Sequence, residues 1–222
     1  MIRILSTKIL KASQKQFLLN AGFAVVEADF IRITRLPFQL LDVADNLIIT
    51  SQNGAKALNA HLDVQEVRRK PVFCVGSKTA DLLDELGFTV QEIAENAADL
   101  AKVIIDGYRT ETFTFFSGNI RRNELPFALF ESDVELNEIE VYETEPTPQQ
   151  MGKFDGVLFF SPSAVESYLS ANQLTNETCF CIGQTTATAL EKITNKITIA
   201  NQPSVENTII QCINHYKNLN LT

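Results

Sequence analysis

The sequence predicts an α/β protein built from two doubly wound parallel sheets. Short apolar strands alternate with helices along the whole chain, which is typical of parallel sheets with right-handed crossovers. Two strand-turn-helix segments recur later in the chain, and the strand count balances if one domain is inserted into the other. The composition agrees, because 222 residues, of which 45% are hydrophobic and 21% charged, suffice for two small globular domains.

The amino-terminal segment predicts a βαβ unit that is too small to fold alone. Residues 2–5 are expected to form a strand, residues 13–20 a helix that ends at Gly22, and residues 24–27 a second strand. Residues 30–36 follow as a separate extended stretch with alternating polarity.

The middle segment predicts five strands separated by four helices. The strands are expected at residues 46–50, 72–75, 89–93, 113–116 and 134–141, and the helices at residues 54–62, 79–86, 97–106 and 123–131.

The last strand of this series carries the most suggestive side chain. Ile139 and Val141 alternate with glutamates, and prolines end the strand at Pro146 and Pro148. This alternation predicts that Tyr142 lies on the polar face, where a phenol could donate a proton. The alternative is a tyrosine that only packs and forms hydrogen bonds.

The carboxyl-terminal segment supplies three more strands, which complete a five-strand set with the two amino-terminal strands. They are expected at residues 156–160, 179–182 and 197–199, with helices at residues 164–169, 186–192 and 205–216. The predicted organisation is a discontinuous domain of residues 1–33 and 147–222, an inserted domain of residues 37–138, and two crossings at residues 30–36 and 138–146 that pair as a two-stranded β ribbon.

An internal repeat supports this division. LIITSQNGAKAL at residues 47–58 aligns with LFFSPSAVESYL at residues 158–169, and VFCVGSKTADLL at residues 72–83 aligns with CFCIGQTTATAL at residues 179–190. In each pair an apolar strand runs through a Ser or Gly turn into a helix, whose first N–H groups can bind an anion.

Several polar residues stand at these turns. Ser51, Thr79, Ser161 and Thr186 either bind an anion or cap their helices, which is the commoner role of such residues. After the strand at residues 113–116 come Ser117, Gly118, Asn119, Arg121 and Arg122. The two guanidinium groups suit carboxylates, although an exposed surface pair is the alternative.

Other classes of function are excluded by composition and motif. A net charge of −8 argues against nucleic-acid binding. Four cysteines and two histidines, without metal-ligand spacing, predict reduced cysteines and no metal site. The Gly76 to Thr79 turn lacks the glycines of a P-loop, and no GxGxxG is present, so no nucleotide cofactor is expected. Without an apolar run of membrane length or a signal-peptide core, the sequence predicts a cytoplasmic protein.

The order and spacing of these blocks resemble those of uroporphyrinogen-III synthase. The blocks are LIITSQNGAKAL, VFCVGSKTADLL, ENAADLAKVI, FFSGNIRRNELP, IEVYETEP, VLFFSPSAVESYL, CFCIGQTTATAL and QPSVENTI. The resemblance runs over nearly the whole chain. It implies two flavodoxin-like α/β domains joined by a two-stranded β ribbon, in an enzyme of haem biosynthesis. A monomer is expected, because nothing in the sequence pattern demands a partner.

The resemblance also implies the activity. The family closes the linear tetrapyrrole hydroxymethylbilane, which carries eight carboxylates, to uroporphyrinogen III. Ring D is inverted, water is lost, and no metal or organic cofactor is required. Tyr142 matches the acid that is favoured for the family. The implied substrate-binding residues are Ser51, Thr79, Ser117, Gly118, Asn119, Arg121, Arg122, Ser161, Ser163, Thr185 and Thr186.

One turn departs from the family pattern. Gln52 and Asn53 stand where the family often has Pro-Arg, so a basic contact at Asn53 is not expected and Arg121 or Arg122 would compensate. The alternative function is a non-catalytic two-domain module that binds an anionic ligand, for which an acid at Tyr142 would have no use.

Overall fold

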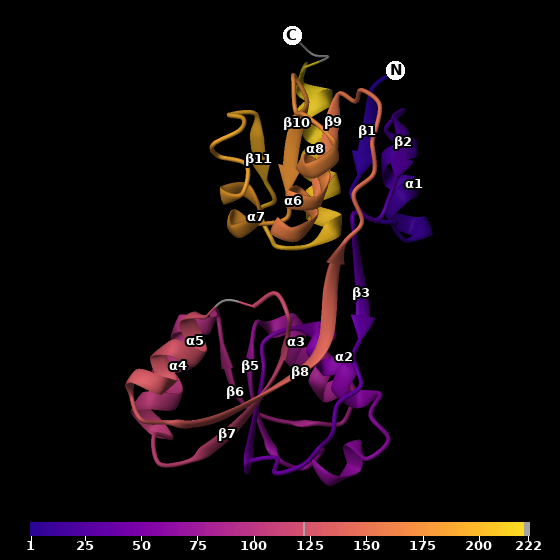
Figure 1. Cartoon of the computed structure of the whole chain (residues 1–222). Coiled ribbons are helices and arrows are strands. Elements are labelled where there is room, and N and C mark those ends of the chain that lie inside the picture. Colours follow the sequence, from indigo (N-terminus) through magenta and orange to yellow (C-terminus); the bar gives the residue numbers. More distant parts are fainter. Residues whose placement is uncertain (122, 220–222) are drawn as a thin grey trace. The chain divides into compact units, whose positions relative to one another are not determined.

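The computed structural model describes residues 1–121 and 123–219, and the chain divides into two compact units (Figure 1). Unit 1 combines Met1–Arg32 with Glu145–Thr222, and unit 2 is Ile33–Thr144. Each unit has helices packed on a sheet of mainly parallel strands, so the predicted mixed α/β class is confirmed.

Unit 1 contains a five-stranded sheet with the order β11-β10-β9-β1-β2, in which all neighbouring strands are parallel. Its strands are β1 (Arg3–Ser6), β2 (Ala24–Glu27), β9 (Gly156–Phe159), β10 (Thr178–Cys181) and β11 (Ile197–Ile199). Its helices are α1 (Ala12–Asn20), α6 (Pro162–Ala171), α7 (Gln184–Thr188) and α8 (Val205–Leu219).

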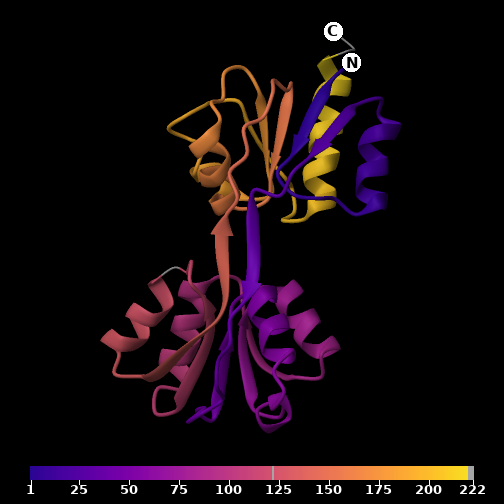
Figure 2. The ribbon, with the colours of Figure 1, turned by 45° about the vertical axis from the view of Figure 1, so that its right-hand side comes forward.

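Helices cover both faces of this sheet (Figure 2). The adjacent residues Ile4 and Leu5 are both fully buried, yet they belong to different clusters. Ile4 packs in the cluster that contains residues of α1 and α8, whereas Leu5 packs with residues of α6 and α7. Burial on both faces explains why the strands are short, continuous apolar runs.

Unit 2 contains a six-stranded sheet with the order β3-β8-β7-β4-β5-β6. Its strands are β3 (Ile31–Arg35), β4 (Asn46–Ile49), β5 (Pro71–Val75), β6 (Thr89–Ala94), β7 (Thr112–Gly118) and β8 (Glu135–Pro146). Strands β4 to β8 pair in parallel, and β3 lies at the edge beside β8. The chain passes between the units within β3 and again within β8.

The helices of unit 2 also divide between the two faces. They are α2 (Gln52–Asn59), α3 (Ser77–Glu85), α4 (Ala97–Gly107) and α5 (Glu124–Glu131), with a short 3-10 helix at Val64–Glu66. Phe116 packs with residues of α2 and α3, and its neighbour Phe115 packs with residues of α4 and α5.

The two sheets correspond strand for strand when β11-β10-β9-β1-β2 is set beside β6-β5-β4-β7-β8. The repeated segments fall on matching elements, because residues 47–58 lie on β4 and α2 while residues 158–169 lie on β9 and α6. The chain order is permuted, since the strands that open unit 1 correspond to those that end the series of unit 2.

Candidate active site

The candidate site lies in unit 2, at the place where the helices that follow two neighbouring strands lie on opposite faces of the sheet. Strands β4 and β7 are neighbours, but α2 follows β4 on one face of the sheet and α5 follows β7 on the other. Helices that diverge in this way leave an opening at the carboxyl ends of the two strands, where ligands of open α/β sheets bind. Ser51 follows β4 at this edge, and Ser117, Gly118 and Asn119 lie at the end of β7.

Tyr142 reaches the same edge from β8, the neighbour of β7. Its hydroxyl lies 3.1 Å from Ser51 Oγ, and the side chain is buried among residues of α2 and α3 with 9% exposed. The prediction that Tyr142 lies on the polar face with the glutamates is therefore wrong.

A β-bulge causes this difference. Ser117 pairs with Glu140, but the next residue, Gly118, pairs with Tyr142, so Val141 is the extra residue on β8. A bulge interrupts the alternation of side chains and re-aims those that follow. Val141 and Tyr142 are accordingly both buried, although they are adjacent.

Gly118 provides the space that the Tyr142 ring occupies. A Cβ atom at position 118 would lie 2.4 Å from Cζ, 2.5 Å from Cε2 and 2.9 Å from the hydroxyl oxygen of Tyr142. Real Cβ atoms do not approach other atoms so closely, so a side chain here would displace the ring. The glycine predicted to bind substrate thus contacts the tyrosine directly.

Asn119 extends the pairing of β7 with β8 beyond the end of β7. Its backbone N–H donates to the Tyr142 carbonyl at 3.2 Å, and its Oδ1 accepts from the Thr144 N–H at 2.8 Å. These bonds hold the backbone of β8 on both sides of residue 143, which fixes the position from which Tyr142 projects.

Ser51 is the N-cap of α2, and its Oγ accepts a hydrogen bond of 3.0 Å from the Gly54 N–H. Ser161 caps α6 in unit 1 in the same way, accepting from the Ala164 N–H at 3.1 Å. The capping interpretation is confirmed for both serines. The sequence pattern does not single out Gly54, although its place three residues after Ser51 is the spacing of an N-cap bond.

Thr79 and Thr186 do not cap their helices. The N-caps of α3 and α7 are Gly76 and Gly183, and each threonine is the third helical residue. Both are buried, with 6% and 2% exposed. The capping interpretation is therefore wrong for these two residues, while Thr185 is exposed and Ser163 half-buried.

Arg121 forms an ion pair with Glu138 of β8, with 2.6 Å between Nη2 and Oε2. Its Nη1 also donates to Asn123 Oδ1 at 2.5 Å. Both side chains of the ion pair are partly exposed. The predicted residue Arg122 lies outside the described residues.

Ser117 is buried, with 3% exposed, and its hydroxyl has no hydrogen-bond partner within the described part of the chain. It is the one predicted site residue of unit 2 whose hydroxyl is both buried and unpartnered there.

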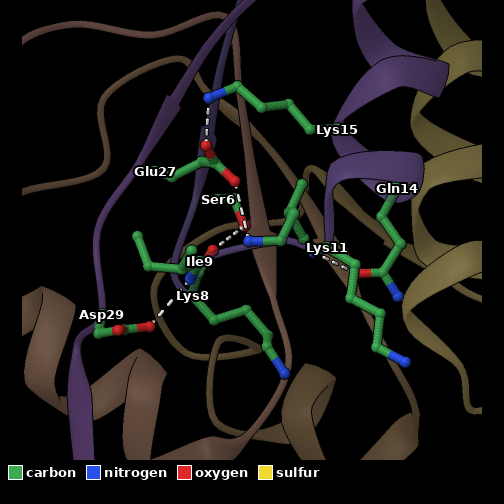
Figure 3. Close-up of polar contacts among 9 residues, drawn as sticks. Ser6, Lys8, Ile9, Lys11, Gln14, Lys15, Glu27 and Asp29 are labelled. Atoms are coloured by element: carbon green, nitrogen blue, oxygen red, sulfur yellow. Dashed lines mark hydrogen bonds and ion pairs between the residues drawn. The ribbon is translucent and has the colours of Figure 1, made fainter.

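Just before α1 in unit 1, the protein's own carboxylates bind two backbone N–H groups (Figure 3). The Ile9 N–H donates to Asp29 at 2.9 Å, the Leu10 N–H donates to Glu27 at 2.8 Å, and Lys15 pairs with Glu27. These N–H groups are not available to an external anion.

The described residues, 1–121 and 123–219, contain no group of three or more His, Cys, Asp or Glu that could hold a metal ion. Within the same ranges, no helix has the length and apolar character needed to cross a bilayer.

The fold and the site define a duplicated α/β protein that carries a Tyr–Ser hydroxyl pair at the carboxyl ends of one parallel sheet. A family model described as uroporphyrinogen-III synthase HemD matches residues 13–210. The chain belongs to this family.

An individual protein of this family is also similar to the chain. The uroporphyrinogen-III synthase of Saccharomyces cerevisiae is 25% identical over an alignment of 169 residues, with 62% of this chain and 62% of the yeast protein covered. The chain thus matches less than two thirds of the length of this relative.

Two solved structures share the fold. One is uroporphyrinogen-III synthetase from Helicobacter pylori, with a TM-score of 0.73, 18% identity, and 97% of this chain and 100% of that chain covered. The other is a mutant uroporphyrinogen III synthase from the extremely thermophilic bacterium Thermus thermophilus, with a TM-score of 0.73, 16% identity, and 99% and 100% covered.

Proposed function

We propose that this chain is a cyclising hydro-lyase that converts hydroxymethylbilane to uroporphyrinogen III, with inversion of ring D and loss of water. Membership of the HemD family favours this function over a non-catalytic anion-binding module. The observation that carries it is the Tyr142 hydroxyl, which lies 3.1 Å from Ser51 Oγ at the carboxyl ends of the unit 2 sheet.

Tyr142 is the proposed general acid. It donates its proton to the substrate hydroxyl, the C–O bond breaks with its electron pair on oxygen, and water leaves. The product of this step is a delocalised azafulvene cation. Ring D then attacks through its substituted carbon to give a spiro intermediate, which fragments and recloses in the inverted sense. The proton that ring D loses on recovering its aromaticity balances the one that Tyr142 gave.

Orientation of the substrate is the larger part of the proposed catalysis, because ring D must meet the cation in one geometry. Helix starts can hold carboxylates through backbone N–H groups without a basic surface, which suits a substrate with eight carboxylates and a chain with a charge of −8. The proposed substrate-binding residues of unit 2 are Thr79, Ser117, Gly118, Asn119 and Arg121. Those of unit 1 are Ser161, Ser163, Thr185 and Thr186.

Arg121 has a particular place in this proposal. Its ion pair with Glu138 orients the guanidinium group and occupies only part of the donor fork, which has five N–H groups. The remaining donors are proposed to anchor a substrate carboxylate.

The organisation of the chain completes the proposal. Units 1 and 2 are proposed to be two flavodoxin-like domains, with β3 and β8 as the two-stranded ribbon that joins them. The strand order of unit 1 is the order of that fold. We also propose that the protein is a monomer. We place it in the cytoplasm because four free, buried cysteines suit a reducing compartment.

The test is to give the purified protein hydroxymethylbilane and to resolve the isomers of the product. The proposal predicts uroporphyrinogen III. Uncatalysed closure gives the symmetric type I isomer, so type I alone would refute the enzymatic function.

A further inference from the structure

We infer that Ser51 is a positioning residue that acts through Tyr142, and that it does not bind the substrate itself. This inference rests on the proposed function, because it assigns to Ser51 a role in the proton transfer from Tyr142. It also replaces the substrate-binding role that the family resemblance implies for this serine.

Two hydrogen bonds of Ser51 Oγ support the inference: the bond from Gly54 has a fixed direction, and in the bond with Tyr142 either hydroxyl can donate. The Gly54 N–H donates to Ser51 Oγ at 3.0 Å, so the serine oxygen is already an acceptor there. The hydroxyl hydrogen of Ser51 is then free to point at the Tyr142 oxygen, 3.1 Å away. In this arrangement Tyr142 accepts from Ser51, and the phenolic hydrogen is directed away from Ser51 for donation to another group.

The same hydrogen bonds stabilise the Tyr142 phenolate that remains after the proton has been transferred. A phenolate needs a donor in place, and Ser51 supplies one without any movement of its oxygen. Because Ser51 is the N-cap of α2, its hydroxyl is polarised by the Gly54 N–H and by the positive end of the helix. Gly54 N–H, Ser51 and Tyr142 therefore form a relay that stabilises negative charge on the phenolic oxygen.

The surroundings keep this relay in one geometry. The Tyr142 ring lies against Gly118, and the side chain is 9% exposed. Gly54 is close to the neighbouring strand, since a Cβ atom there would lie 3.1 Å from the Phe116 carbonyl oxygen. Both ends of the relay are thus fixed by close packing against β7.

Capping alone does not explain this arrangement. Ser161 caps α6 with a hydrogen bond of 3.1 Å, close to the 3.0 Å of the Ser51 cap. Within the described residues, this cap is the only hydrogen bond of the Ser161 hydroxyl. Ser51 has the cap bond and also the bond to a tyrosine. The bond to Tyr142 is what distinguishes the two serines.

The test is a double-mutant cycle that measures kcat and KM for the wild type, Ser51→Ala, Tyr142→Phe and the double variant. A hydrogen bond to a charged group typically changes a rate by about tenfold or more, so Ser51→Ala should lower kcat by about tenfold and leave KM within about twofold. In the Tyr142→Phe background the same change should have no further effect on kcat. Ser51→Thr, which keeps the hydroxyl, should restore most of the lost activity.

A matched control separates loss of the cap from loss of the relay. Asn96 caps α4 in the same unit, accepting from the Asp99 N–H at 2.9 Å. Asn96→Ala removes an equivalent cap bond and should lower the melting temperature about as much as Ser51→Ala does, while kcat stays unchanged.

Two results would overturn the inference. One is an equal fall in kcat on Ser51→Ala with and without the Tyr142 hydroxyl. The other is a rise in KM at constant kcat, which would indicate direct binding of substrate. Failure of the proposed function looks different, because the wild type would then form no type III isomer.

Discussion

At the scale of single residues, the position of the Tyr142 ring depends on the absence of a side chain at Gly118. The tyrosine was predicted from the strand pattern and the family resemblance, but its face was predicted wrongly. The bulge that turns it inward depends on how β7 and β8 pair, and a pairing register is not visible in the pattern of one strand. The ion pair of Arg121 with Glu138 could not be predicted either, because it joins β8 to the segment after β7 and so also depends on how the two strands pair.

The contact between these two residues predicts that Gly118→Ala will impair catalysis as a tyrosine variant does. The added Cβ would lie 2.4 Å from Tyr142 Cζ, so the ring must move and its hydroxyl loses the position that it has beside Ser51 Oγ. We expect kcat to fall at least tenfold, and the free energy of unfolding to fall by about 1–3 kcal/mol because of overpacking. Steady-state kinetics and urea unfolding would measure both effects.

Gly107→Ala is the matched control, because nothing lies within 4 Å of a Cβ atom built at this helical position. It should leave kcat unchanged and stability equal or slightly higher. A Gly118→Ala variant with wild-type kcat would contradict the close contact with Tyr142.

At the scale of elements, the sequence predicted the order and type of the helices and strands better than their starts. The first helix of unit 2 was expected at residue 54, but α2 begins at Gln52 with Ser51 as its cap. Asn53 and Gly54 are poor helix formers, and only the hydrogen bond from the Gly54 N–H to Ser51 Oγ identifies the start. The threonines were misassigned because a Ser or Thr near a turn does not reveal its distance from the N-cap.

The segment that leads into β10 depends on an ionised carboxylate. Glu177 Oε2 accepts from the Thr175 N–H at 2.7 Å and from the Asn176 N–H at 2.9 Å. Burial raises the pKa of Glu177, but the hydrogen bonds together lower the pKa by more than burial raises it. The pKa of Glu177 therefore lies below its usual range. A carboxyl group with a lower pKa in the folded state stabilises the fold above its unfolded pKa of about 4.3. This contribution is lost as the pH falls through the folded-state pKa.

Glu177→Gln should therefore lower the free energy of unfolding at pH 7 by about 1–3 kcal/mol, because two backbone donors lose a charged acceptor. The loss should shrink as the pH falls from about 5 to below the folded-state pKa. Urea unfolding followed by circular dichroism across this range measures it. Glu166→Gln, at an exposed position of α6, should change stability by less than about 0.5 kcal/mol. A variant of Glu177 with wild-type stability at pH 7 would contradict this role.

At the scale of the whole molecule, the duplication was visible in the sequence because both copies keep the strand-turn-helix segments. The matching of β4 with β9 and of β5 with β10 could be predicted from those segments. The matching of β7 and β8 with β1 and β2 could not, since the permutation places these strands at opposite ends of their units. The four cysteines are free and buried, and burial raises the pKa of Cys74 to about 11 and of Cys179 and Cys181 to about 12, as expected for structural thiols.

The most direct test of the account is the isomer composition formed from hydroxymethylbilane by the wild type and by Tyr142→Phe under the same conditions. We expect the wild type to give uroporphyrinogen III. In Tyr142→Phe, kcat should fall about a hundredfold with little change in KM, so that the type I isomer from uncatalysed closure becomes prominent. Type I alone from the wild type would contradict the activity, and type III at the wild-type rate from Tyr142→Phe would contradict the role of the tyrosine.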